Sequence, residues 1–357
     1  MSPKGPEASA DAAIELANEI VSTQGSIFVR ELLRAKRRAH LPVRIGATKP
    51  EVLANLIDAI RSGFVTFEDL TTWLAEVEGW GKQHAYLYRV SAQFSRDSLW
   101  SSGDGFLEAA RRRGVRIPNE AGRLLDFPDR LTLGALTFRG GQFEALWRQK
   151  EVGWERDSSA DLKKTMDGDL YELRAWRQLL RRAVVRFVLR PTEHRAALLV
   201  QLPIGDAHTA AVNTAMSALG GLFPLKELRP VSVSEAIKAF DQADLSGEGG
   251  ELPGGRGRIR AQDTRFSAQG ATVQFGAEER LGSYNEVTAV RRVRQALRPN
   301  DFAGDHAKFD LDLRSGKGLN RSVTIAMSGP DKRIYLFAQM TAPEVWSILD
   351  DVIARVQ

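Results

Sequence analysis

The 357-residue sequence predicts an α+β protein with a helical N-terminal domain, an α/β middle region and a β-rich C-terminal module with amphipathic helices. Three observations support this fold class. Up to about residue 80, apolar residues recur with helical spacing between recognisable caps. Beyond residue 130, β-branched and alternating segments are interspersed with helical ones. Residues 245–257 (LSGEGGELPGGRG), just before the last hundred residues, form a glycine-rich run that is typical of a linker.

These patterns predict five segments along the chain. Residues 1–10 are expected to be disordered, 11–125 to form a basic helical domain, 126–244 an α/β domain, 245–260 a glycine-rich linker, and 261–357 a module of sheet and helix. Hydrophobic residues make up 43% of the chain, which is enough for well-formed cores. The sequence contains no cysteine, which excludes disulfides, thiolate zinc sites and a cysteine nucleophile.

The most specific stretch, residues 28–63, predicts two helices joined by an extended loop. Wound at about 100° per residue, residues 29–40 separate an apolar side from an arginine side. Lys36 alone points into the apolar half, where its stem packs while the ammonium reaches water. Leu41-Pro42 is expected to end this helix, and a capping box formed by Thr48 and Glu51 to begin the next. The arginine side consists of Arg30, Arg34, Arg37 and Arg38.

Residues 28–63 also concentrate the positive charge. They contain eight Lys or Arg residues against three acids, Glu31, Glu51 and Asp58, which is an excess of five. The formal net charge of the whole chain is also +5. The basic character is therefore a local face, which suits a polyanion or an acidic partner.

This stretch resembles the SAP motif, a short helix, loop, helix unit used for binding DNA. The resemblance covers residues 28–63, and Gly46 and Lys49 are separated by one residue more than is usual in the motif. It implies that the first helix and the loop contact phosphates. The matching residues are Val29, Glu31, Leu32, Leu33, Leu41, Pro42, Gly46, Lys49, Leu53, Leu56 and Ile57, and the implied contacts are Arg34, Arg37, Arg38, Arg44 and Lys49.

Two further basic segments are candidates to extend a phosphate-binding face. EGWGKQHAYLYR (78–89) places Lys82 among aromatic residues, which either stack on nucleic acid or, more commonly, pack in the core of a small helical domain. FLEAARRR (106–113) ends in three arginines, which equally suit a solvated helix C-terminus. The full predicted DNA-contacting set is Arg30, Arg34, Arg37, Arg38, Arg44, Lys49, Lys82, Arg111, Arg112 and Arg113.

The rest of the chain predicts alternating strands and helices. Residues 131–147 indicate two strands around Gly140-Gly141, apolar spacing from Leu170 to Leu180 indicates a helix, and 184–189 and 196–202 indicate strands. Helices are expected at 209–219, 232–243 and 285–297, and strands at 272–275, 308–313, 323–327 and 333–337. A last helix begins at Thr341, and its Trp346 face is expected to be buried or to form a dimer contact. The domain order, with Gly282-Ser283-Tyr284 before a helix, is similar to the layout of the CENP-N family of centromere proteins.

Catalytic motifs are missing from the sequence. It has no G-x-S-x-G elbow and no Walker A lysine, and its five histidines lack zinc-site spacing. Asp310 and Asp312 share a face of a predicted strand, with Asp301 and Asp305 nearby, so they are candidates for a metal-dependent nuclease. Alternating aspartates on a solvated edge strand explain them more simply. The sequence therefore predicts no catalytic residue, no metal ion and no cofactor.

The expected function is that of a non-catalytic protein contacting the phosphate backbone of double-stranded DNA, largely independent of sequence, because arginines supply phosphate contacts but no evident base-reading set. The alternative is an interaction adaptor whose basic face binds an acidic partner. A homodimer or protein partner would use the C-terminal module. No run approaches about 18 apolar residues and the N-terminus lacks a secretory signal, so a cytoplasmic location without membrane contact is expected. The hypothesis is of a prokaryotic protein, nucleoid-associated if it binds DNA.

Overall fold

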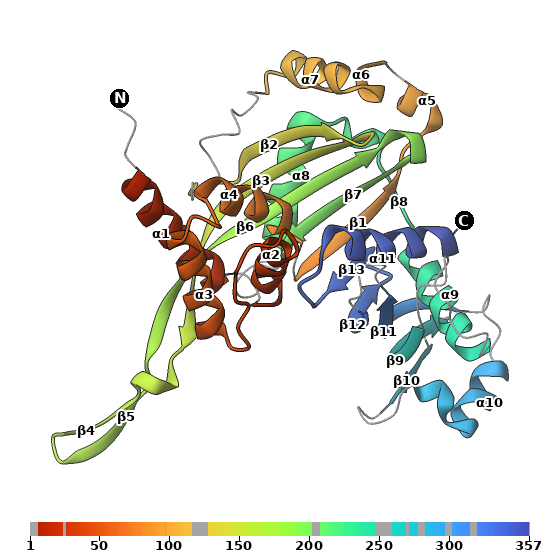
Figure 1. The fold of residues 1–357 in the computed structure, drawn as a ribbon. Helices are drawn as coiled ribbons and strands as arrows, with labels where there is room; N and C mark the ends of the chain where they lie inside the picture. The colour runs from red at the N-terminus through yellow and green to blue at the C-terminus, as the bar shows by residue number, and fades with distance from the viewer. Residues whose placement is uncertain are drawn as a thin grey trace. The chain divides into compact units, whose positions relative to one another are not determined.

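The computed structural model describes residues 6–23, 26–80, 82–96, 98–115, 128–201, 208–246, 259–268, 271–277, 283–296, 302–314 and 320–356 (Figure 1). The protein is α+β, with helices at its N-terminus and a large antiparallel sheet with helices in the middle and C-terminal parts. Its contacts divide it into two units, Met1–Glu78 and Gly79–Gln357. Among the residues described, no helix has the length and apolar content that a membrane span requires.

Unit 1 is built from four helices that share one apolar core. They are α1 (Pro6–Thr23), α2 (Ser26–Arg38), α3 (Lys49–Arg61) and α4 (Phe67–Val77). Leu16, Leu33, Leu56 and Leu70, one from each helix, are almost completely buried in this core. Residues 6–10 belong to α1, so disorder was the wrong prediction for them; Pro6 at the start and the alanines that follow suit a first helical turn. Residues 1–5 lie outside the described residues.

Unit 2 contains a wide sheet in which every described strand pair is antiparallel. The strand order is β10-β9-β11-β12-β13-β1-β7-β6-β3-β2, with the short β8 beside β1. A separate hairpin is formed by β4 (Leu162–Met166) and β5 (Asp169–Leu173). The sheet strands are β1 (Gln83–Arg89), β2 (Thr132–Arg139), β3 (Gln142–Arg156), β6 (Trp176–Arg190), β7 (Arg195–Gln201), β8 (Arg229–Pro230), β9 (Ile259–Ala268), β10 (Ala271–Gly276), β11 (Ala303–Arg314), β12 (Asn320–Ser328) and β13 (Arg333–Leu336).

Helices lie between these strands in the sequence. They are α5 (Ala92–Arg96), α6 (Ser98–Ser101), α7 (Gly103–Arg112), α8 (His208–Leu222), α9 (Val233–Ser246), α10 (Thr288–Ala296) and α11 (Ala342–Arg355). The helices predicted at 209–219, 232–243, 285–297 and from Thr341 are confirmed within one to three residues at their ends. Short 3-10 turns occupy Ser158–Ala160, Pro191–Glu193, Leu225–Glu227 and Tyr284–Glu286.

Strand β1 joins the two halves of the sheet. It pairs with β13 on one side and with β7 on the other, so residues 83–89 are part of unit 2 rather than of a helical domain ending at 125. Trp80, His84 and Tyr88 are buried, which confirms core packing for this aromatic segment, although the packing is on a sheet. The predicted linker at 245–260 lies largely outside the described residues, because only its first two and last two residues are placed, in α9 and β9.

Side chains alternate across the sheet and enter two different cores. Ala85 and Leu87 of β1 pack in the core beneath α9 and α11, whereas Tyr88 packs in the core that includes α7 and α8. In α11, Trp346 and Leu349 are buried in the first of these cores. The Trp346 face is therefore an internal packing surface, and the alternative of a dimer contact through it is wrong.

The helix predicted from Leu170 to Leu180 is also wrong, because this segment forms β5 and the start of β6. Asp167 (φ 53°) and Gly168 (φ 89°) both have positive φ, as a two-residue type I′ hairpin turn requires. An Asp-Gly pair between apolar residues is a strong hairpin signal, and it outweighs the apparent helical spacing of Leu170, Leu173 and Trp176.

Asp351 on α11 makes the stability of unit 2 depend on pH. Burial raises the pKa of its carboxyl to about 6, even though Arg355, whose Nε donates a hydrogen bond to Asp351 Oδ1 at 3.1 Å, acts to lower the pKa. A raised carboxyl pKa means that the folded state binds the proton more tightly. The stability that this proton contributes is therefore present near pH 4 and is lost as the pH rises to 6.

Asp351→Asn should consequently stabilise unit 2 above pH 6 and leave it unchanged near pH 4. The shift from the ordinary value of 3.8 to about 6 sets an upper limit of about 3 kcal/mol on the gain. Urea unfolding between pH 4 and pH 8 measures it. A difference between variant and wild type that stays constant over this range would contradict the assignment.

Candidate nucleic-acid interface

The first helix of the 28–63 stretch ends two residues earlier than the sequence suggested. His40 adopts a left-handed conformation (φ 61°), and the amide of Leu41 donates a hydrogen bond to the carbonyl of Lys36 at 3.2 Å. The amide of His40 donates to the carbonyl of Arg37 at 3.0 Å. These two bonds form a Schellman motif, which ends α2 before Leu41-Pro42 is reached.

The loop after α2 returns to the first turns of the same helix. The guanidinium of Arg30 donates a hydrogen bond to the carbonyl of Ala47, and Gly46 before it has a φ of 75°. Arg30 is therefore half-buried and holds the loop in place, so its role is structural rather than that of a free phosphate contact.

Helix α3 begins with the predicted capping box, which occupies the amides of Ala47, Thr48 and Glu51. Thr48 accepts a hydrogen bond from the amide of Glu51, and Glu51 Oε2 accepts from the amides of Ala47 (2.7 Å) and Thr48 (3.3 Å). These hydrogen bonds lower the pKa of the Glu51 carboxyl, and the bond from the Ala47 amide has the largest effect. A carboxylate of the protein thus already fills the position that a phosphate could take at this helix end. Phosphate contacts in this region are therefore expected mainly from side chains.

Gly46 is needed in this loop for two separate reasons. Its positive φ disfavours any L side chain, and a Cβ atom would lie 2.9 Å from backbone and Cβ atoms of Glu51 and from the amide of Val52. Gly46→Ala should therefore destabilise unit 1 by about 2 to 4 kcal/mol, measured by urea unfolding with hydrogen exchange of α2 and α3.

Gly63→Ala is the matched control, because Gly63 has a φ of 72° but no atom lies within 4 Å of the position that an added methyl group would take. Gly63→Ala should lower the free energy of unfolding of unit 1 by only about 1 kcal/mol, the cost of placing an alanine at a positive φ. Equal losses for the two variants would contradict the close packing of the loop on α3.

Several of the predicted contact residues are paired within unit 1. The guanidinium of Arg34 forms an ion pair with Glu31, and Arg38 lies 3.6 Å from the other oxygen of the same carboxylate. Lys36 does not simply reach water as expected, because its ammonium lies 2.7 Å from Asp69, the residue that completes the capping box of α4. Lys36 therefore ties α2 to α4. The sequence pattern missed this pair because Asp69 lies outside the 28–63 stretch.

Other cations of this stretch remain exposed. Arg37 and Arg44 are exposed and form no ion pair with the part of the chain that the structure describes, and the Arg38 side chain is 68% exposed. Lys49 is exposed, and its ammonium lies 3.4 Å from the carbonyl of Ser22. The structure thus leaves Arg37, Arg38 and Arg44 as the most accessible cations on α2 and the loop. We call these three arginines and Lys49 the basic face.

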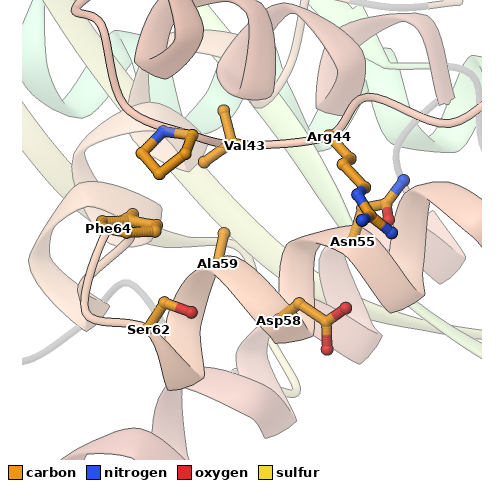
Figure 2. A pocket seen from close by; sticks show the side chains of 8 residues that line it. Val43, Arg44, Asn55, Asp58, Ala59, Ser62 and Phe64 are labelled. Atoms are coloured by element: carbon orange, nitrogen blue, oxygen red, sulfur yellow. The ribbon is translucent and has the colours of Figure 1, made fainter.

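A small hollow lies between the loop and α3. Figure 2 shows Val43, Arg44, Asn55, Asp58, Ala59, Ser62 and Phe64 around it, and Pro42 completes its lining. Its volume is about 90 Å³, room for about three water molecules. A hollow of this size is too small for a nucleotide or a cofactor.

The remaining predicted contacts belong to unit 2. Lys82 is exposed just before the start of β1. Helix α7 packs through Phe106 on Phe143 of β3. Strand pairing across the sheet places Phe143 in line with Tyr88, near the opposite end of β1. At the end of α7, Arg112 pairs with Glu108 at 3.0 Å, and Arg113 donates to the carbonyl of Gly220 at 3.4 Å. Arg111 is exposed. Lys82 and the α7 arginines therefore do not form one patch.

The carboxylates considered for a nuclease are engaged in the sheet. Asp312 accepts two hydrogen bonds from Arg260, at 2.7 and 3.0 Å, and Asp310 accepts one from Thr324 at 2.6 Å. Their strand, β11, lies between β9 and β12, so the expectation of an edge strand is wrong. Asp301 lies outside the described residues, and among the residues described no three potential ligands are grouped closely enough to hold a metal ion.

The chain was also compared with known proteins. No protein-family model matches it, and no curated protein matches it.

Proposed function

We propose that unit 1 binds the phosphate backbone of double-stranded DNA through the basic face, without catalysis. The observation that carries this proposal is the exposure of Arg37, Arg38 and Arg44 on a helix and loop whose conformation is fixed by internal hydrogen bonds. A fixed scaffold reduces the ordering cost of binding, and guanidinium groups match phosphate oxygens well.

The grouping of the exposed arginines suits a duplex. Arg37 and Arg38 end α2 and Arg44 follows in the loop, so three exposed cations lie within eight residues of the chain. Duplex DNA carries one charge per about 1.7 Å of its axis, so a group of this kind can meet several phosphates at once. An isolated acidic side chain would use only one of these arginines.

The same residues offer no evident base-reading set, so we expect binding that is largely independent of sequence. Helix α2 (SIFVRELLRAKRR) contains neither Asn nor Gln, and the free cations are arginines on a helix and in a loop. Phosphate contacts of this kind position a protein on DNA without selecting a sequence. A protein working in this way fits a cytoplasmic, nucleoid-associated role.

Fluorescence anisotropy at about 50 mM salt tests the proposal. Labelled duplexes of unrelated sequence should bind with similar affinity, and single-stranded DNA and RNA serve as comparisons. If no duplex binds the nuclease-treated full chain at low salt, the proposal fails. Capture of an acidic protein that survives nuclease treatment and moderate salt would instead support the adaptor function.

A further inference from the structure

Strands β3 and β6 extend beyond their neighbours as a two-stranded ribbon. Residues 149–156 pair with residues 176–183, whereas β2 pairs with β3 only up to Arg148 and β7 pairs with β6 only from Val185. The hairpin of β4 and β5 follows at the far end of this ribbon. Figure 1 shows the ribbon and the hairpin extending away from the rest of the sheet. In the described strand pairings, the ribbon is thus flanked by no further strand.

One face of the ribbon presents two tryptophans to solvent. Side chains alternate along a strand and paired residues share a face, so Trp154 and Arg156 of β3 lie on the same face as Trp176, which pairs with Arg156. Trp154 is 63% exposed, Trp176 is 56% exposed, and Val152 on the same face is 49% exposed. The two tryptophans are diagonal neighbours on adjacent strands, a spacing of about 7 Å. We call Lys150, Val152, Trp154, Arg156 and Trp176 the tryptophan face.

The guanidinium of Arg156 lies against Trp176 and is itself fixed. Its central carbon lies 5.9 Å from the centre of the Trp176 ring. Both of its terminal nitrogens donate to the carboxylate of Asp161, and one of them also donates to the carbonyl of Ala175 at 2.9 Å. The hydrogen bond from Arg156 is the main reason that the pKa of the Asp161 carboxyl falls to about 2. An indole beside a fixed guanidinium is ordered before any ligand arrives, which lowers the cost of binding.

The strand residues of the tryptophan face contribute only positive charge. Among the side chains that the structure describes on this side of the ribbon, Lys150, Arg156 and Arg182 are cations, and neither strand contributes an acid. Glu151 lies on the opposite face by the same alternation. The ammonium of Lys150 lies 3.6 Å from Asp129, but that carboxylate is 89% exposed, so the pair is weak and leaves Lys150 available to an anion.

Two other occupants fit this face less well. Packing it on the same face of a second copy would bring the cations of one ribbon towards those of the other. Insertion into a bilayer is disfavoured at the end of the hairpin, because its turn carries Asp167 and Asp169. An unpaired nucleic-acid strand suits both the rings and the charge, since each of its bases has a flat face to stack and each of its phosphates is an anion.

We propose that the tryptophan face binds single-stranded nucleic acid, with neighbouring bases stacked on Trp154 and Trp176 and a phosphate near Lys150. A duplex does not offer the same contacts, because its bases are already paired and stacked within the helix. The tryptophan face belongs to unit 2, so this site is distinct from the basic face of unit 1 and does not depend on duplex binding there.

Substitution of the two tryptophans tests the site in the full-length chain, purified free of nucleic acid. Fluorescence anisotropy at about 50 mM salt follows a labelled oligothymidylate of about 12 nucleotides, and oligouridylate in its place decides between DNA and RNA. Trp154→Ala and Trp176→Ala should each weaken binding about tenfold, and together about 100-fold, because each removes the stacking of one base. Duplex affinity should change less than about twofold.

Matched variants separate stacking from simple apolar contact. Trp154→Phe keeps an aromatic ring and should lose less than about threefold in affinity. Trp154→Leu keeps apolar surface without a ring and should lose about tenfold. Leu170→Ala is the control on the hairpin, because it removes a side chain that is 70% exposed but has no ring, and it should leave the affinity unchanged.

Wild-type protein that binds neither oligonucleotide would overturn the proposal. So would a double tryptophan variant that binds as well as wild type, a Trp154→Leu variant that binds like Trp154→Phe, or equal losses for oligonucleotide and duplex. Binding to vesicles of phosphatidylcholine and phosphatidylserine, without binding to oligonucleotides, would assign the face to a membrane instead. The same tryptophan losses are expected when Arg37, Arg38 and Arg44 are reversed to Glu, so a failure of duplex binding by unit 1 leaves this test intact.

Discussion

Reversing Arg37, Arg38 and Arg44 to Glu should weaken duplex binding about 1000-fold at about 50 mM salt. Each reversal removes the release of about one counterion, and three such losses amount to about three orders of magnitude at this salt concentration. Arg34 is left in place because it pairs with Glu31, and Arg30 because it holds the loop at Ala47. Anisotropy with the duplexes described above measures the loss.

A control with the same change of net charge separates a site from general attraction. Arg130, Arg139 and Lys226 are exposed residues of unit 2, and reversing them also lowers the net charge by six. This control should lose less than about tenfold in affinity. Equal losses in the two triple variants would show that the basic face is not the binding site.

The second large effect is expected from the buried ion pair of Arg294 and Asp241. Arg294 on α10 pairs with Asp241 on α9, and the two residues are 4% and 0% exposed. The hydroxyl of Tyr284 donates a hydrogen bond to the same aspartate. Burial lowers the pKa of the Arg294 guanidinium to about 10, but this value is still well above neutral pH, so Arg294 remains charged. Removing one member leaves a buried charge without its partner, so Arg294→Met should destabilise unit 2 by about 3 to 5 kcal/mol.

A double-mutant cycle checks the cause of this loss. Asp241→Asn should also be strongly destabilising, because it leaves Arg294 charged among Phe266, Phe275 and Phe302. The double variant contains neither buried charge and should lose clearly less than the sum of the single variants. Urea unfolding, followed by hydrogen exchange of the β9 amides, measures the loss of stability in the two single variants and the double variant. Additive losses would contradict a coupled pair.

Local sequence signals predicted much of the fold. The capping box at Thr48, the helix that follows Thr341 and the glycine turn at Gly140 lie where the sequence indicated. Strand pairing was harder to predict, because β1 lies far in sequence from β13 and β7, and no local pattern specifies such partners. Residues 170–180 show a different error, since helical spacing was given more weight than the Asp167-Gly168 turn.

The candidate site shows the same division between local and distant information. The arginine row of α2 follows directly from helical geometry. Which of its members are free depends on partners that the row itself does not contain, such as Glu31 for Arg34 and Ala47 for Arg30. Sequence reasoning therefore identified a basic face, and the structure reduces its accessible centre to Arg37, Arg38 and Arg44.

The most direct test of a phosphate-binding function is the salt dependence of duplex affinity. If three to four cations of the basic face each displace a counterion, log K against log salt should fall with a slope of about −3. The slope should be nearly flat for the Arg37, Arg38 and Arg44 reversal. A wild-type affinity that does not change between low and moderate salt would contradict phosphate binding by unit 1.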